Sequence, residues 1–344
     1  MAKDAAFLLV SFGGPEGPDD VMPFLRNVTA GRNVPDERLA QVAQHYFAFG
    51  GVSPINARNR ELLGAIKRAF TADGIELPVY WGNRNWRPLL ADTMQAMADD
   101  GVRSVIAFAT AAYSSFSSCR QYLEDIDRAR AAVGANAPAV VKIPPYYGHE
   151  GFAAAFIETT SHALASLPAG IRDDAELVFT AHSIPESMAA ASGPDGHAYQ
   201  AQLTEVAGRV AAGLGRSAFQ LAYQSRSGPP SVPWLGPDIN ECLTSVAKAG
   251  APAVVVVPIG FVSDHMEVVF DLDVEAARTA ADLGLPMARA ATPGADHRFA
   301  ALISSLVGDF AAGARGDGLA RAWSSALGSS AARLCGERCC RIAP

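Results

Sequence analysis

The sequence predicts an α/β protein in which helices flank parallel β-sheets. Short apolar runs recur along the chain, and between them lie amphipathic stretches with the period of a helix. Strands that alternate with helices in this way typically form parallel sheets. The chain also carries a weak internal repeat, because LLVSFGGP (8–15) resembles VFTAHSIP (178–185), each a strand that ends in a turn and a proline. We therefore expect two similar halves.

The predicted elements follow in order along the chain. Seven apolar runs are expected to be strands: 6–12, 77–82, 102–110, 139–147, 175–181, 219–225 and 252–261. Amphipathic helices are expected at 35–48, 57–72, 88–100 and 197–214, and another helix beginning near residue 263 or 264. The boundary between the halves is expected near PPYYGHEG (144–151). We predict a first domain of residues 1–147 plus about 315–344, and a second domain of residues 148–314.

Composition narrows the possible function classes. The 344 residues carry a formal net charge of −7 and no run rich in Lys and Arg, which argues against nucleic acid as a partner. The apolar runs reach about ten residues, too short for an integral membrane segment. The N-terminus resembles a strand rather than a signal peptide, so we expect a cytoplasmic protein. Motifs of dinucleotide, nucleoside triphosphate, hydrolase and zinc protease sites are missing: GxGxxG, GxxxxGK[ST], GxSxG and HExxH.

Acidic residues line the helix expected after the last strand. At about 100° per residue, Asp264, Glu267, Asp271 and Glu275 fall within roughly a quarter-turn of one face. No Lys or Arg occurs within 258–277, so these carboxylates have no basic partner beside them on the helix. A row of carboxylates near a strand end suits a divalent cation. The alternative is an acidic helix face in contact with water.

His182 follows an apolar strand at the point where the chain turns. The carboxyl ends of parallel strands meet at one edge of a sheet, where ligands bind in open α/β folds. The strand before Glu267 ends at the same edge, so an imidazole and a carboxylate would face one crevice and could accept protons or hold a metal. A hydrogen-bonded structural histidine is the alternative. The internal repeat places Phe12 at the equivalent position of the first half.

Three loops suit an anionic or planar ligand. Ser53 lies in a glycine-containing loop before a helix, whose N–H groups can hold an anion. Arg120 and Tyr122 lie among several hydroxyl residues at another junction between a strand and a helix. The Pro- and Gly-rich loop 223–238 is either an ordered connection or the wall of a pocket.

Three of the five cysteines lie in the last ten residues. Cys335, Cys339 and Cys340 have the spacing C-x3-C-C, and Cys119 would complete four thiolates for an iron–sulfur cluster. Adjacent cysteines would need a tight turn to face one site. The alternative is a tail with incidental thiols, and Cys242 is expected to serve packing.

Seven blocks of the sequence, taken together, resemble the ferrochelatases, and most of all the coproporphyrin-type enzymes of bacteria. The resemblance runs from about residue 7 to about 310. It is carried by SFGGPEGPDDVMPFLRNV, FGGVSPIN, GNRNW, YSSFSSCRQY, FTAHSIP, QSRSGPPSVPWLGPD and PIGFVSDHMEVVFDLD. It implies two similar chelatase-like α/β domains with a porphyrin cleft between them.

The resemblance also implies roles for individual residues. His182 and Glu267 match the catalytic pair that handles Fe2+ and protons, and Asp271 and Glu275 match an acidic entry path for iron. The residues that match porphyrin-contacting or cleft-lining positions are Ser53, Tyr122, Phe12, Arg32 and Tyr46. Some family members have Tyr where this chain has Phe12, and phenylalanine cannot ligate iron. Other members hold a 2Fe–2S cluster, for which the matching ligands are Cys119, Cys335, Cys339 and Cys340.

The implied reaction is insertion of Fe2+ into coproporphyrin III to give Fe-coproporphyrin III (coproheme) in heme biosynthesis. Binding would bend the macrocycle and expose its nitrogens, and transient contact with neighbouring heme-synthesis enzymes is expected. Turns rich in Arg and hydroxyl groups favour coproporphyrin III, which has four propionates, over protoporphyrin IX, which has two. The alternatives are a protoporphyrin IX ferrochelatase and a tetrapyrrole carrier without catalysis. The division of labour between His182 and Glu267 stays open.

Overall fold

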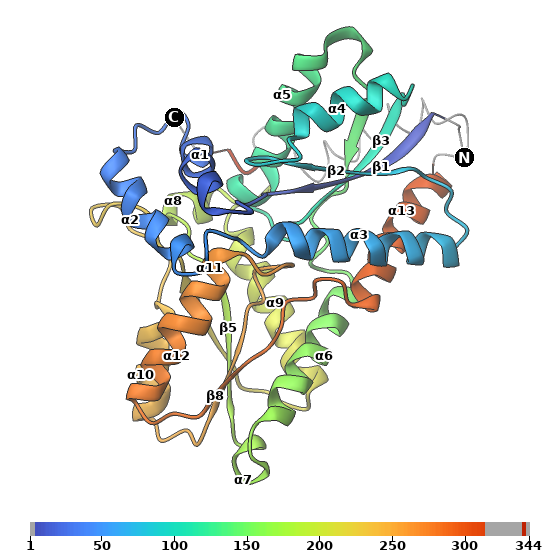
Figure 1. Cartoon of the computed structure of the whole chain (residues 1–344). Coiled ribbons are helices and arrows are strands. Elements are labelled where there is room, and N and C mark those ends of the chain that lie inside the picture. The colour runs from blue at the N-terminus through green and yellow to red at the C-terminus, as the bar shows by residue number, and fades with distance from the viewer. Residues whose placement is uncertain (1–3, 314–338, 342–344) are drawn as a thin grey trace. The chain divides into compact units, whose positions relative to one another are not determined.

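The computed structural model describes residues 4–313 and 339–341. These residues form two compact units, and each unit is built on one parallel sheet of four strands (Figure 1). Of the described residues, the first unit contains 4–110, 121–144 and 303–313. The second unit contains 111–120, 145–302 and 339–341.

The first sheet has the strand order β2-β1-β3-β4. Its strands are β1 (Ala5–Ser11), β2 (Val79–Asn83), β3 (Ser104–Ala109) and β4 (Ala139–Lys142). The helical elements of this unit are α1 (Pro18–Val28), α2 (Asp36–Phe47), α3 (Ile55–Ala72), α4 (Leu90–Asp99), α5 (Gln121–Val133) and η2 (Gly134–Asn136). Helix α3 lies on one side of the sheet and α4 and α5 lie on the other (Figure 1). All seven residues of β1 are therefore buried, as in a sheet covered on both faces.

The second sheet has the order β6-β5-β7-β8. Its strands are β5 (Glu176–His182), β6 (Gln220–Gln224), β7 (Val254–Val257) and β8 (Met287–Arg289). The helical elements are η1 (Phe116–Arg120), α6 (Glu150–Ser166), α7 (Ala169–Arg172), α8 (Glu186–Ala190), α9 (Ala198–Gly213), α10 (Ile239–Lys248), α11 (Met266–Val268), η3 (Val269–Ala276), α12 (Ala277–Asp282) and α13 (His297–Gly313), the last of which is shared by both units. Helices α6 and α9 cover one face and α10 and α12 the other (Figure 1).

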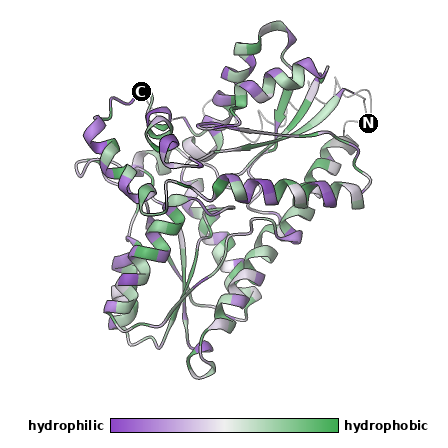
Figure 2. Cartoon of the chain, viewed as in Figure 1, coloured by the Kyte–Doolittle hydropathy of each residue, from purple (hydrophilic) through white to green (hydrophobic). Residues whose placement is uncertain are grey.

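The predicted α/β architecture with two similar halves is confirmed. The two sheets have equivalent strand orders, with β1 and β5 in corresponding inner positions. The internal repeat therefore reflects the fold, because LLVS ends β1 and VFTAH ends β5. Figure 2 shows mostly hydrophobic strands in the first sheet and helices that mix hydrophobic and hydrophilic residues, which is the pattern used for the prediction.

All seven predicted strands are present, but sequence analysis missed β8. This strand has three residues, lies at the edge of its sheet and is only partly buried. An edge strand of this kind leaves no apolar run in the sequence, so periodicity cannot reveal it. The omission matters for function, because β8 ends in Arg289.

The division into units differs from the predicted domains in four described segments. Residues 111–120, 145–147 and 339–341 belong to the second unit rather than the first, and residues 303–313 belong to the first rather than the second. The Tyr113 hydroxyl donates to the Ile259 carbonyl at 2.8 Å, and the Ser114 N–H donates to Gln202 at 2.7 Å. These hydrogen bonds join residues 111–120 to the second unit. They connect residues that are far apart in the sequence, so local sequence pattern does not predict them. The predicted placement of residues 314–338 lies outside the described residues.

The acidic helix also departs from expectation. It begins at Met266, rather than near residue 263 or 264, and its central part is the π-helix η3. A π-helix has hydrogen bonds from residue i to i+5, and such turns are frequent at functional sites. Asp264 precedes the helix and lies outside the acidic row, whereas Glu267, Asp271 and Glu275 lie on it.

None of the helices within residues 4–313 is both long enough and apolar enough to cross a bilayer. The cytoplasmic location stays a prediction.

Candidate functional site

A close approach between two segments of the second unit builds the site. The turn after β7 passes so near β5 that a Cβ on Gly260 would lie 2.6 Å from the Cβ and 2.7 Å from the Cα of Ala181. The Gly260 N–H donates to the Thr180 carbonyl at 3.0 Å. Only glycine fits this contact without a backbone shift. Because Ala181 precedes His182, the contact brings the chain leading to Glu267 against the end of β5.

His182 and Glu267 meet at this edge of the sheet, as predicted. The distance from His182 Nε2 to Glu267 Oε2 is 3.5 Å. His182 Nδ1 lies 2.5 Å from the Ser183 carbonyl oxygen, which can only accept, so Nδ1 carries a proton. The Tyr199 hydroxyl donates to the His182 carbonyl at 3.0 Å and fixes the backbone. In neutral His182, the Nε2 lone pair therefore faces the site.

The charges around His182 favour its protonated form. Burial lowers the pKa of His182, but the hydrogen bond and charge of Glu267 outweigh it, with smaller contributions from the Ser183 carbonyl and Asp271, so the net pKa is raised. The neighbouring His265 behaves in the opposite way. Burial lowers the pKa of His265 and outweighs the charge of Glu267, which raises it, and the charge of His182 lowers it further. The pKa values of the two imidazoles are thus moved in opposite directions.

Asp271 lies in a partly buried polar network at the same edge. The Ser225 hydroxyl donates to Asp271 Oδ2, and Gln224 Nε2 lies 3.4 Å from the same oxygen. Thr180 in turn donates to Gln224 Oε1 at 3.0 Å. Burial raises the pKa of Asp271 to about 7, against the Ser225 hydrogen bond, and the charges of Glu267 and other acidic neighbours add to the rise. Asp271 can therefore gain or lose a proton near neutral pH.

The network around Asp271 was missed by sequence analysis. Gln224 and Ser225 lie in the QSRSG block at the end of β6, which sequence analysis interpreted as either an ordered connection or the wall of a pocket. Ser225 has a positive φ of 62°, which aims its hydroxyl at the acidic helix. That backbone conformation has no signal in the sequence, because serine rarely adopts it.

In the first unit, Phe12 and Tyr122 are both packed against one arginine. The Arg84 guanidinium lies 4.6 Å from the centroid of the Tyr122 ring and 5.6 Å from that of Phe12. Arg84 also pairs with the buried Asp125, which accepts from Arg128 as well. Burial lowers the pKa of Arg84. The structure thus places two predicted porphyrin-contacting residues on a common cationic support that sequence analysis did not identify.

The other predicted residues of this unit have different surroundings. Ser53 is 4% exposed. A Cβ added to Gly14 would lie 2.7 Å from the Cβ of Ser53, so the turn after β1 packs directly on Ser53. Tyr46 is buried, with its ring 5.9 Å from that of Phe24. Arg32 is exposed in the turn after α1. Ser53 and Tyr46 are thus fixed in place, whereas the Arg32 side chain extends into solvent.

The cysteines form a second group in the second unit. Cys119, Cys339 and Cys340 make one buried cluster, and the sulfurs of the adjacent pair lie 3.7 Å apart. Cys340 has a φ of 57°, which supplies the tight turn that the pair requires. The Gly193 N–H donates to Cys340 Sγ at 3.2 Å. Burial raises the pKa of Cys340 to about 12, against the Gly193 hydrogen bond, and the neighbouring thiols add to the rise. Cys335 lies outside the described residues.

No group of three or more His, Cys, Asp or Glu side chains in the described ranges is already arranged to hold a metal ion. His182 with Glu267, and the three thiols, are therefore candidate ligand sets whose side chains would adjust on binding.

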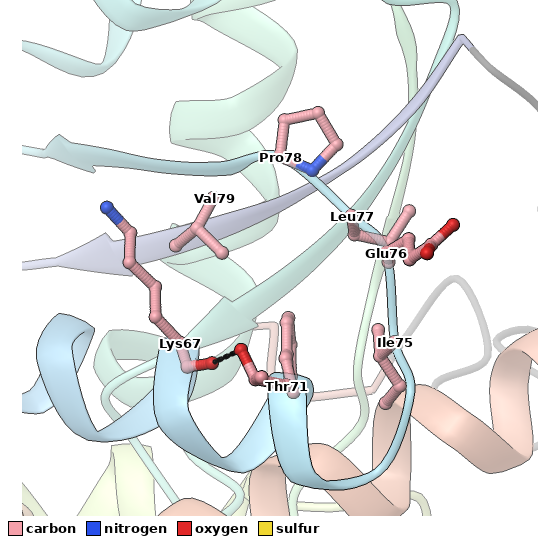
Figure 3. Close-up of a pocket in the computed structure, with 8 residues that line it drawn as sticks. Lys67, Thr71, Ile75, Glu76, Leu77, Pro78 and Val79 are labelled. Carbon is pink, nitrogen blue, oxygen red and sulfur yellow. Dashed lines mark hydrogen bonds between the residues drawn. The ribbon is translucent and has the colours of Figure 1, made fainter.

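A surface pocket of about 310 Å³ lies elsewhere in the first unit, between the end of α3 and the start of β2 (Figure 3). It opens at the amino end of β2, whereas Phe12 follows the carboxyl end of the neighbouring β1. Figure 3 shows that Lys67 and Glu76 point away from each other there. The pocket therefore lacks a pair of groups comparable to His182 and Glu267.

Comparison with known proteins places this geometry in a family. The profile of the ferrochelatase family matches residues 4–310. The chain is a ferrochelatase family member. It is 51% identical to the coproporphyrin III ferrochelatase of Streptomyces coelicolor, over 97% of this chain and 92% of that one. It is 54% identical to the coproporphyrin III ferrochelatase of Nocardia farcinica, over 88% of this chain and 87% of that one.

Solved structures agree on the fold. SirB from Bacillus subtilis with Fe3+ matches with a TM-score of 0.56 and 12% identity, over 92% of this chain and 98% of that chain. A SirB structure with cobalt, described as a sirohydrochlorin chelatase, gives a TM-score of 0.53 at 13% identity, over 91% and 98% of the two chains. The ferrochelatase fold expected from the sequence is therefore confirmed.

Proposed function

We propose that this protein inserts Fe2+ into coproporphyrin III and forms Fe-coproporphyrin III. The observation that carries the proposal is the His182–Glu267 pair at the carboxyl edge of the second sheet. The chain that holds this pair is about half identical to coproporphyrin III ferrochelatases over most of its length. The site residues and their roles are proposed on the same basis.

The reaction requires a proton acceptor, because Fe2+ replaces two pyrrole N–H protons. His182 is suited to this role since Nδ1 donates to the Ser183 carbonyl and leaves Nε2 to accept. Glu267 can take the proton on to water, because its side chain is 49% exposed. The His182 side chain is itself 32% exposed, so the imidazole and the carboxylate together give protons a route to water.

Iron delivery is assigned to the acidic helix. Glu267, Asp271 and Glu275 are spaced four residues apart on α11 and η3. Oxygen ligands suit Fe2+ before it loses its water. The raised pKa of Asp271 means that this carboxylate is partly protonated near neutral pH, so it can bind a cation and release it again.

Phe12, Tyr122 and Ser53 are proposed to contact the porphyrin, with Tyr46 and Arg32 nearby in the sequence blocks that match the family. Phe12 is an apolar ring and cannot ligate iron, so it can pack against the macrocycle but leaves no protein oxygen at that position. Arg84 behind Phe12 and Tyr122 would keep both rings in fixed orientations.

The direct test is anaerobic metallation of coproporphyrin III or protoporphyrin IX by the purified protein, followed by the porphyrin absorption spectrum. We expect coproporphyrin III to gain iron, and His182→Ala to abolish this. His162→Ala is a matched control, because His162 also pairs with a glutamate, Glu158, but on the exposed surface of α6. Preference for protoporphyrin IX would change the substrate, and binding of both porphyrins without metallation would indicate a carrier.

The buried thiols are proposed to bind a 2Fe–2S cluster. The described donors fit such a group because Cys119, Cys339 and Cys340 are clustered and a backbone N–H already points at Cys340 Sγ. Cys335, four residues before Cys339, would be the fourth ligand. Three thiols gathered in one buried place are the type of donor that an iron–sulfur cluster requires.

Iron and acid-labile sulfide measured on anaerobically purified protein, together with its visible absorption, test the cluster. Cys119→Ser should lose both. Cys242→Ser should keep both, because Cys242 is equally buried but lies in a separate core where its thiol contacts Gln220. Equal sulfide in the two variants would contradict the ligand assignment.

A further inference from the structure

We propose that Arg289 is a positioning residue for iron insertion, and that its guanidinium holds both flanks of the segment that carries Glu267 and Asp271. The proposal rests on the proposed function. Arg289 does not lie on the acidic helix. Its positioning role depends on its contacts with Asp264 and Asp273, and none of these three residues belongs to the pair His182–Glu267.

One guanidinium serves two carboxylates in a paired geometry. Arg289 Nη1 and Nη2 donate to the two oxygens of Asp264 at 3.2 and 3.3 Å. Arg289 Nε and Nη2 donate to the two oxygens of Asp273 at 2.6 and 2.9 Å. The remaining Nη1 hydrogen goes to the Ala290 carbonyl at 3.3 Å. All five N–H donors of the guanidinium are therefore used.

These contacts flank the proposed iron-handling residues in the sequence. Asp264 lies three residues before Glu267, and Asp273 lies two residues after Asp271. The arginine thus closes a loop that contains Glu267, Asp271 and the start of the π-helix. A segment fixed at both flanks can hold Glu267 at its 3.5 Å distance from His182.

Strand order places the arginine there. β7 and β8 are parallel neighbours, with Val256 opposite Arg289. The side chain at the carboxyl end of β8 therefore lies next to the segment that leaves the carboxyl end of β7 and continues to Asp264. No basic residue on that segment could replace it, because positions 258–277 contain no Lys or Arg.

Burial makes the pairing selective. The side chains of Asp264 and Arg289 are 10% and 18% exposed, and that of Asp273 is 37% exposed. Without the guanidinium, Asp264 and Asp273 would repel each other and would offer Fe2+ two carboxylates beside the path. Arg289 therefore has two effects that follow from the same contacts: it fixes Glu267, and it keeps two nearby carboxylates from competing for iron.

The test compares Arg289→Lys with wild type in steady-state metallation, with Fe2+ and porphyrin varied separately. Lysine keeps the charge but cannot form the bidentate pairs that the guanidinium makes with the two carboxylates. We expect kcat to fall about tenfold or more and KM for Fe2+ to rise, with KM for the porphyrin unchanged. Arg298→Lys is the matched control, because Arg298 also bridges two carboxylates, Asp296 and Glu158, away from the acidic helix.

Chemical rescue separates positioning from folding. A surface pocket of about 270 Å³ lies beside Arg289; it is lined by Thr159, His162, Ala163, Ser166, Arg289 and Ala291. Millimolar guanidinium chloride should restore part of the rate of Arg289→Ala and leave Arg298→Ala unchanged. Asp273→Asn provides a milder variant, since it keeps the Arg289–Asp264 pair, and it should show the same kinetic pattern more weakly.

The outcomes are distinguishable. If the wild type inserts no iron, the proposed function fails before Arg289 is tested. If wild type inserts iron, but Arg289→Lys has a normal kcat and a normal KM for Fe2+, the positioning role is wrong. The positioning role is also wrong if Arg298→Lys loses as much activity as Arg289→Lys. It is wrong as well if the activity of each variant falls only in proportion to its fraction of folded, porphyrin-binding protein.

Discussion

Replacement of Glu267 by glutamine should lower the pKa of His182. His182 Nε2 and Glu267 Oε2 are separated by 3.5 Å. Glu267 is 49% exposed, so water screens the pair, and Coulomb's law with a dielectric constant near 80 gives about 1 kcal/mol for the attraction between the two charges. The glutamine variant should lose this contribution to proton binding by His182. The sign follows from the carboxylate, whose negative charge favours protonated imidazole.

The assay is an NMR titration of the His182 ring in the metal-free protein, with the signal assigned by its loss in His182→Gln. The contributions should follow an order. Glu267→Gln should lower the pKa most, Asp271→Asn less, because its charge acts more weakly, and Glu275→Gln least, because it is not among the groups that shift His182. A pKa that stayed constant or rose in Glu267→Gln would refute this account of the pair.

Three further predictions concern the surroundings of the site. Gly260→Ala should slow metallation and destabilise the protein by about 1–3 kcal/mol, because the new methyl group meets the backbone of β5, whereas Gly170→Ala has open space. Folded Asp271 has a raised pKa and therefore keeps a proton that the unfolded chain loses. Asp271 thus lowers the stability of the protein as pH rises from about 4 to about 7. The thermal midpoint of Asp271→Asn should therefore rise relative to that of wild type between about pH 5 and pH 8. Arg84→Met should cost about 3 kcal/mol in denaturant unfolding, because Asp125 keeps only its exposed arginine partner; a loss below 1 kcal/mol would contradict this.

Local pattern in the sequence was enough to predict seven of the eight described strands and to place His182 and Glu267 at one edge of a sheet. Apolar runs such as VVVV in β7 are buried on both faces of a sheet, so their composition alone marks them as strands. His182 and Glu267 each follow such a run. Because parallel strands end at a common edge, the sequence predicted that these two side chains lie at the same edge, and the structure brings them to 3.5 Å.

The residues that support the pair were decided by tertiary structure. Arg289 ends a three-residue edge strand with no apolar pattern, and its partners lie 16 and 25 residues away in the chain. Ser225 reaches Asp271 only through a backbone conformation that serine seldom adopts. Hydrophobic periodicity records burial along one element, whereas ion pairs and hydrogen bonds between elements depend on register and on single dihedral angles. The sequence by itself therefore determined the family, the strands and the two central side chains, and the folded structure determined what holds those side chains in place.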